Sequence, residues 1–69
     1  MKRVLVTGGG GFLGTAVVKQ LLEEGCTVKV AGRNSYDHLV RLGVTCLVGD
    51  IGDKIFTEEA CRNVDTVFH

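Results

Sequence analysis

The sequence predicts an α/β fold built on a parallel sheet, and three observations support this prediction. Short apolar runs alternate along the chain with segments of helical periodicity, an order that indicates successive βαβ units. The first apolar run, residues 4–6, contains no polar residue, as is typical of a parallel strand covered on both faces. The segments are joined by short connections that contain glycine or aspartate. We expect such units to have right-handed crossovers.

The first half of the chain predicts two strands separated by a helix. Glycines at positions 8–11 end the first strand, and the period is helical over residues 12–24. Gly25 is expected to end this helix, and residues 27–31 to form the second strand with Val28 and Val30 inward. The helix is expected to bury one apolar stripe. This stripe consists of Leu13, Ala16, Val17, Gln20 and Leu21, and Val18 and Leu22 widen it.

The second half predicts two more strands and two short helices. Residues 36–42 predict a weak helix that ends at Gly43, and residues 44–48 a third strand. A turn over residues 49–53 follows, in which Asp53 is expected to cap a helix over residues 54–62. Residues 64–69 predict the beginning of a fourth strand.

Charge, hydropathy and cysteine usage exclude several classes of protein. Eight basic and eight acidic residues give a net charge of zero, whereas nucleic-acid binders carry a basic face. No apolar run approaches the roughly 20 residues that a membrane span needs. The three cysteines form no Cys-x-x-Cys pair, which argues against a disulfide framework or a metal site and predicts thiols in or near the core. This usage fits a reducing compartment, so a cytoplasmic location is expected.

The glycine cluster between the first strand and the first helix predicts a phosphate-binding loop. Two registers fit: G-x-G-x-x-G on Gly9, Gly11 and Gly14, and G-x-x-G-x-x-G on Gly8, Gly11 and Gly14. Glycine permits a tight turn and a close approach of the backbone to phosphate, and the free N–H groups of the first helical turn attract its charge. A turn without a ligand is the alternative, but ordering four consecutive glycines costs conformational entropy, and a simple turn does not require this cost. The predicted cofactor-binding residues of this loop are Gly8, Gly10, Gly11, Phe12, Leu13 and Gly14.

Residues 1–69 are therefore predicted to be the N-terminal part of a Rossmann-type dinucleotide-binding domain. In such a sheet the ligand crevice lies between the first and fourth strands. The chain supplies one side of this crevice and the beginning of the other. We expect it to be a fragment of a longer protein or a truncated reading frame.

The second register, with Thr7 before it and Phe12-Leu13 within it, resembles the extended short-chain dehydrogenase/reductase family, in particular its 3β-hydroxysteroid dehydrogenase-like branch. Residues 48–53 are similar to the Gly-Asp-hydrophobic-x-Asp turn of that family, and residues 64–69 to its fourth strand. The resemblance implies that Asp50 pairs with the adenine amino group and that the backbone amide of Ile51 meets the ring. Alternatively, Asp50 is only a turn residue and Ile51 only a core residue.

The end of the second predicted strand favours NADP over NAD as the cofactor. NAD-binding loops usually carry an acid there, which bonds the ribose 2′-hydroxyl. The family's acidic position holds Gly32 instead, and Arg33 follows it. A guanidinium offers a planar fork of donors to a 2′-phosphate. The alternative is that Arg33 is a solvated loop charge, and Asp37 is the nearest acid.

The resemblance implies catalysis by a Tyr-x-x-x-Lys pair. Residues 1–69 do not contain this pair, because Tyr36 is followed four positions later by Val40. No catalytic residue is therefore assigned. The leading hypothesis is the cofactor-binding start of an NAD(P)-dependent oxidoreductase or epimerase that acts on a hydroxyl or carbonyl group of a sterol-like or nucleotide-sugar substrate. The alternative is a non-catalytic NAD(P)-binding sensor or scaffold. A third possibility is a stand-alone chain that self-associates through an exposed sheet edge.

Overall fold

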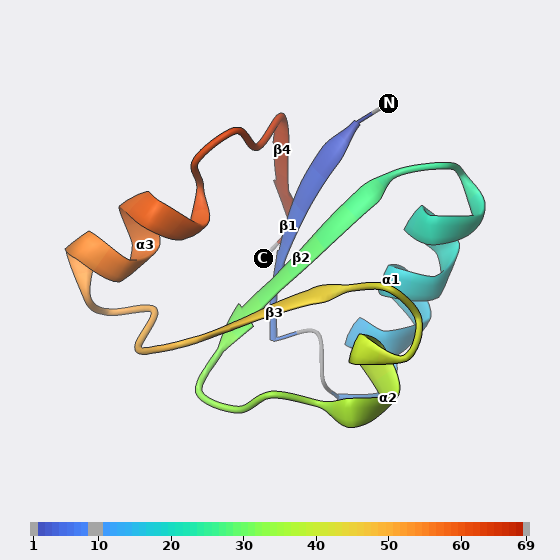
Figure 1. Ribbon diagram of the computed structural model, residues 1–69, viewed down its shortest axis with the longest axis horizontal. Coiled ribbons are helices and arrows are strands. Elements are labelled where there is room, and N and C mark those ends of the chain that lie inside the picture. Colours follow the sequence, from blue (N-terminus) through green and yellow to red (C-terminus); the bar gives the residue numbers. More distant parts are fainter. Residues whose placement is uncertain (1, 9–10, 69) are drawn as a thin grey trace.

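A computed structural model describes residues 2–8 and 11–68 of the chain. They form a parallel sheet with the strand order β3-β2-β1-β4, so that β1 and β2 are central. Figure 1 shows α1 and α2 on one side of this sheet and α3 on the other. Along the chain the elements are β1 (Arg3–Thr7), α1 (Phe12–Glu23), β2 (Thr27–Gly32), α2 (Asp37–Val40), β3 (Thr45–Val48), α3 (Lys54–Ala60) and β4 (Thr66–Phe68).

The two faces of the sheet bury different amounts of apolar surface. Successive side chains of a strand point to opposite faces. Val4 and Val6 therefore lie toward α1 and α2, whereas Leu5 lies toward α3. The cluster on the α1 side contains eight buried residues: Val4, Val6, Val18, Leu21, Val28, Val30, Leu39 and Val44. The cluster on the α3 side contains three: Leu5, Ala31 and Ala60. Most of the described core therefore lies between the sheet and α1 and α2.

The structure corrects the stripe predicted for α1. Val18 is fully buried and Leu21 nearly so, but the side chain of Leu13 is 76% exposed, and Ala16 and Gln20 are exposed as well. The helix is turned so that Val18 meets the sheet. The flank that carries Leu13 and Ala16 is directed instead toward β4, where no described element packs over it.

Two predicted helix boundaries are confirmed, the end of α1 and the start of α3. Gly25 follows the C-cap of α1 with a φ of +85°, a left-handed conformation that favours glycine. Gly43, with a φ of +92°, instead ends the turn that follows α2, because that helix ends at Val40. The side chain of Asp53 accepts hydrogen bonds from the amides of Ile55 and Phe56 at 2.9 and 3.2 Å, so the predicted cap of α3 is present.

The second half of the chain is less helical than predicted. Helix α2 spans four residues rather than seven, and α3 ends at Ala60 rather than at position 62. Leu39 is the single buried side chain of α2, so a short turn is enough to place it. After α3 the chain reverses at Asn63, whose φ is +60°. The last predicted strand residue, His69, lies outside the described residues.

The cysteines lie near the core, as predicted. Cys26 and Cys46 pack against the cluster on the α1 side and Cys61 against the cluster on the α3 side. All three thiols are free and partly buried. Among the described residues, no helix is long and apolar enough to cross a membrane.

Candidate functional site

The candidate site lies at the carboxyl edge of the sheet, where β1 ends and α1 begins. A hollow of about 390 Å³ opens there beside the last residue of β4. Its wall combines the glycine loop with the exposed flank of α1. The residues that line it are Val6, Thr7, Gly8, Gly11, Leu13, Gly14, Val17 and Phe68. Four of the six predicted loop residues therefore surround one space.

The beginning of α1 has the features of an anion-binding helix end. Gly8 has a φ of +71°, and Gly11 is the N-cap residue in an extended conformation. The first helical hydrogen bond runs from the Thr15 amide to the Gly11 carbonyl at 2.9 Å. No side chain caps this end within the described part of the chain, and its first turn contains no acidic residue. The first amides of a helix have no acceptor within the helix, and such amides can bind an anion.

The space above the glycines is open. A β-carbon on Gly8 or Gly11 would meet no atom within 4 Å, so packing within the chain does not require glycine there. At Gly8 the positive φ favours glycine, and at both positions the absent side chain leaves room for a group that approaches the backbone. Open space beside a helix N-terminus is an arrangement that can accept a phosphate group. Gly10 and the side chain of Phe12, two further predicted contacts, lie outside the described part of the structure.

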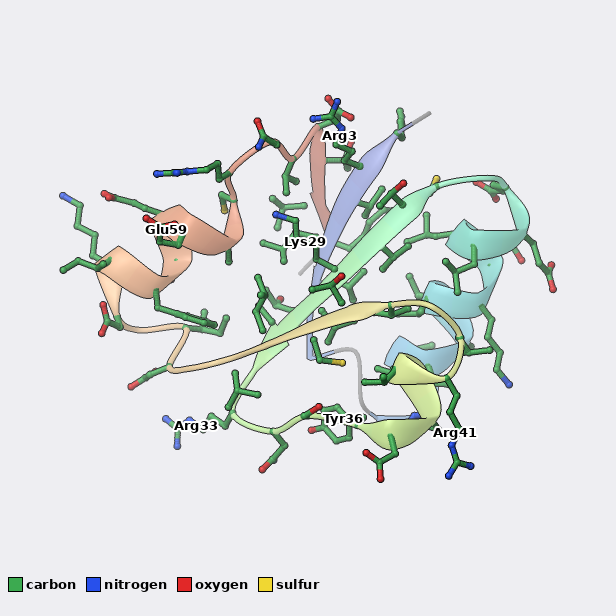
Figure 2. All side chains as sticks on the ribbon, viewed as in Figure 1. Arg3, Lys29, Arg33, Tyr36, Arg41 and Glu59 are labelled. Carbon is green, nitrogen blue, oxygen red and sulfur yellow. The ribbon has the colours of Figure 1, made fainter. Side chains whose placement is uncertain are left out.

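Two of the three predicted contacts beyond the loop, Arg33 and Asp50, come together at the ends of β2 and β3. Arg33 Nη2 lies 3.9 Å from Asp50 Oδ1, with side chains that are 81% and 62% exposed. Figure 2 shows Arg33 directed away from the sheet at the end of β2. An ion pair this exposed contributes little to stability. A β-carbon on Gly32, the preceding residue, would also stand in open space.

The turn that carries Asp50 and Ile51 is held by its own hydrogen bonds. Asp50 Oδ1 accepts from the Gly52 amide at 2.8 Å, and the Asp50 carbonyl accepts from the Asp53 amide at 2.9 Å. Ile51 is partly buried against the cluster on the α3 side. The turn role of Asp50 and the core role of Ile51 are therefore both present. Neither excludes a contact with adenine, which stays a prediction.

Sequence reasoning missed three contacts that support these loops. His38 Nε2 lies 3.2 Å from Thr15 Oγ1 and ties α2 to the first turn of α1. The Thr57 hydroxyl donates to the Ile51 carbonyl at 2.7 Å, and the Phe56 ring lies so close to Gly49 that a β-carbon would overlap it. No motif signals these pairs, because each depends on how a helix is placed against another helix or a neighbouring loop.

The described residues contain no group of three or more His, Cys, Asp or Glu side chains placed to hold a metal ion. The polar groups at the carboxyl edge include backbone amides at the start of α1, the Arg33 guanidinium and the Asp50 carboxylate. Groups of this kind can bind and orient a phosphorylated nucleoside.

The fold and this edge define a Rossmann-type nucleotide-binding unit. Its fold matches the crystal structure of vestitone reductase from alfalfa with a TM-score of 0.85 and 29% sequence identity, over all of this chain and 24% of that one. Residues 5–69 match the 3-beta hydroxysteroid dehydrogenase/isomerase family. The chain belongs to this family, which implies a nicotinamide dinucleotide cofactor.

Curated relatives agree with this assignment. The chain is 43% identical, over 97% of its length, to 2-alkyl-3-oxoalkanoate reductase of Stenotrophomonas maltophilia, of which it covers 20%. It is 40% identical, again over 97% of its length, to 3-beta-hydroxysteroid dehydrogenase of Mycolicibacterium neoaurum, of which it covers 18%. The chain thus spans about a fifth of the length of the curated relatives it matches.

Proposed function

We propose that this chain forms the adenosine- and pyrophosphate-binding part of an NADP-dependent oxidoreductase that interconverts a ketone and a secondary alcohol. The names of three relatives, a 2-alkyl-3-oxoalkanoate reductase, a 3-beta-hydroxysteroid dehydrogenase and a sterol-4-alpha-carboxylate 3-dehydrogenase, support this reaction class. These names favour a sterol-like or 3-oxo acid substrate over a nucleotide sugar. The bound dinucleotide would supply the hydride chemistry, and the residues of this chain would hold its adenosine half.

The glycine loop would bind the pyrophosphate. Gly8, Gly11 and Gly14 line the hollow, and a β-carbon on Gly8 or Gly11 would meet no atom within 4 Å. The backbone amides of the first turn of α1, those of Phe12 and Leu13 among them, would donate to the phosphate oxygens. Gly10 completes the loop in this proposal. Since α1 has no acidic residue in its first turn, nothing there opposes the negative charge of the ligand.

The turn after β3 would bind the adenine ring. The amino group of adenine is a donor and its N1 is an acceptor, so the ring requires one acceptor and one donor side by side. Asp50 has a carboxylate and Ile51 the adjacent backbone amide. The second carboxylate oxygen of Asp50 would accept from the amino group, and the Ile51 amide would donate to the ring.

The preference for NADP is supported chiefly by Arg33. Its guanidinium is exposed at the end of β2, next to Gly32 and the open space around it. A carboxylate at position 32 would repel a 2′-phosphate, whereas glycine admits it and Arg33 would bond it through two parallel N–H groups.

The proposal is tested with adenosine 2′,5′-bisphosphate and AMP, which share adenosine and its 5′-phosphate and differ only in the 2′-phosphate. Titration calorimetry of the purified protein should give an affinity for the bisphosphate about tenfold higher than for AMP. Arg33→Ala should remove this difference and leave AMP binding unchanged. Arg41→Ala is the matched control, because Arg41 is also an exposed arginine but lies at the end of α2. Equal binding of the two ligands by the wild-type protein would contradict the NADP assignment.

A further inference from the structure

We infer that Thr57, a residue of α3, is a positioning residue for adenine that acts through the peptide between Ile51 and Gly52. The inference deepens the proposed function and rests on it, because it concerns how the Asp50 turn is prepared to receive the ring. The Thr57 hydroxyl donates to the Ile51 carbonyl at 2.7 Å in a partly buried position. This side chain touches neither of the two groups assigned to adenine.

The peptide between Ile51 and Gly52 is held at both of its polar ends. Its carbonyl accepts from Thr57, and its N–H, which belongs to Gly52, donates to Asp50 Oδ1 at 2.8 Å. A peptide unit is planar, so fixing its carbonyl also fixes the direction of its N–H. Thr57 therefore orients the donor that holds the Asp50 carboxylate. With Oδ1 engaged in this way, Oδ2 is the oxygen left for a ligand.

The preceding peptide presents the second group. Its carbonyl, on Asp50, accepts from the Asp53 amide at 2.9 Å, and its N–H belongs to Ile51. Carbonyl and N–H point in opposite directions in a trans peptide, so the Ile51 N–H is directed away from Asp53. Within residues 2–8 and 11–68 this N–H has no acceptor. An acceptor oxygen and an unpaired donor therefore lie on adjacent residues, the pattern that adenine requires.

Thr57 is itself fixed by α3. Its amide donates to the Asp53 carbonyl at 3.0 Å, one turn after the Asp53 side chain caps the helix. The neighbouring Phe56 ring packs against Gly49, just before Asp50. The hydroxyl thus projects from a capped helix that is packed on the turn, so the turn is preorganised before any ligand arrives. Preorganisation of this kind lowers the ordering cost of binding.

The test compares Thr57→Val with Thr57→Ser in the purified protein. Valine keeps the shape of threonine but removes the donor, whereas serine keeps the donor. Thr57→Val should weaken ADP binding about tenfold and leave the binding of inorganic pyrophosphate unchanged, because pyrophosphate meets only the glycine loop. Thr57→Ser should bind ADP within about twofold of the wild type. Both ligands are titrated by NMR, in which the Gly52 amide resonance also reports the state of the turn.

Lys29→Met separates positioning from a general loosening of α3. Lys29 Nζ donates to the Arg62 carbonyl just beyond the other end of this helix, at 2.9 Å, and Figure 2 shows Lys29 on the α3 side of β2. If Lys29→Met lowers the melting temperature as much as Thr57→Val does, it should still bind ADP as the wild type does. Equal losses of ADP affinity in the two variants would overturn the inference, as would full ADP affinity in Thr57→Val. Failure of the wild-type protein to bind ADP or pyrophosphate would instead refute the proposed function.

Discussion

Helices α1 and α3 both begin just beyond the carboxyl end of a strand, yet their first turns are built in opposite ways. At α3 the Asp53 side chain accepts from the amides of Ile55 and Phe56, so the chain itself satisfies the donors that a helix start leaves free. At α1 the N-cap is Gly11, and no side chain within the described residues makes a capping hydrogen bond there. The start of α3 is therefore satisfied by the chain itself, whereas the uncapped start of α1 agrees with the binding role that we propose for it.

The glycines near these two helices show the same contrast. A β-carbon on Gly11 would stand in open space, whereas one on Gly49 would overlap the Phe56 ring of α3. Gly49 is therefore required by packing within the chain. Gly11 leaves a space that the chain does not fill, beside a hollow of about 390 Å³.

The largest expected effect comes from making the start of α1 resemble that of α3. Gly11→Asp supplies an N-cap carboxylate where Gly11 already has an extended conformation, so stability should change by only a few tenths of a kcal/mol. The carboxylate would occupy and charge the phosphate position, and ADP affinity should fall about 100-fold, or about 2.7 kcal/mol. Calorimetry and thermal unfolding measure the two effects. Gly11→Asn, an uncharged residue of the same size, should lose less affinity, and equal losses would argue against the role of charge.

Gly49→Ala should have the next largest effect, on stability rather than on the binding of pyrophosphate. The new methyl group would overlap the Phe56 ring, and overpacking of this kind typically costs about 1–3 kcal/mol. Chemical denaturation should show this loss, and Gly49→Ala combined with Phe56→Val should recover part of it. Gly32→Ala is the control, because its methyl group would enter open space. If both single variants are equally stable, the close packing of Gly49 is not a constraint.

Gly32→Asp tests whether the end of β2 lies next to the 2′-position of the bound nucleotide. A carboxylate there should repel a 2′-phosphate and lower the affinity for adenosine 2′,5′-bisphosphate about tenfold, or about 1.4 kcal/mol. ADP should bind as before or more tightly, because the new side chain would accept from a free 2′-hydroxyl. Competition between the two ligands measures the ratio directly. An unchanged ratio would place the 2′-position elsewhere on the protein.

Asp53→Ala is the converse of Gly11→Asp and should have the smallest effect. It removes the cap of α3 and should lower the free energy of unfolding by about 1 kcal/mol. Pyrophosphate affinity should not change, since no residue of α3 lines the hollow. Asp53→Asn, which keeps an acceptor oxygen, should restore most of the stability in denaturant titrations. A loss of pyrophosphate binding in Asp53→Ala would show that the two helix starts are not independent.

The order of elements and several of their ends could be read from the sequence because they depend on local properties. Apolar runs and helical periodicity predicted the four strands and three helices in their observed order, and Gly25 and Gly43 stand at positive φ where a helix or turn ends. Asp53 was predicted as a cap from its position before a helical segment, and its side chain makes the capping bonds. Each of these features involves residues only a few positions apart.

Features that involve residues distant in the sequence depend on the tertiary structure. The buried face of α1 is set by how the helix lies on the sheet, so Leu13 is exposed although the periodicity placed it in the apolar stripe. The hydrogen bond from Thr57 to Ile51 and the approach of Phe56 to Gly49 depend on the placement of α3 against the preceding turn. Arg33 and Asp50 likewise meet only because parallel strands bring their carboxyl ends to one edge.

The sequence by itself determined that a glycine loop stands between a strand and a helix, since this follows from residue type and spacing alone. Glycine was equally apparent at positions 11 and 49. Only the folded chain shows that the space beside Gly49 is filled by Phe56 and that the space beside Gly11 is open. Residue type specifies which backbone conformations are allowed. The packing of distant elements decides which of the glycines has open space beside it.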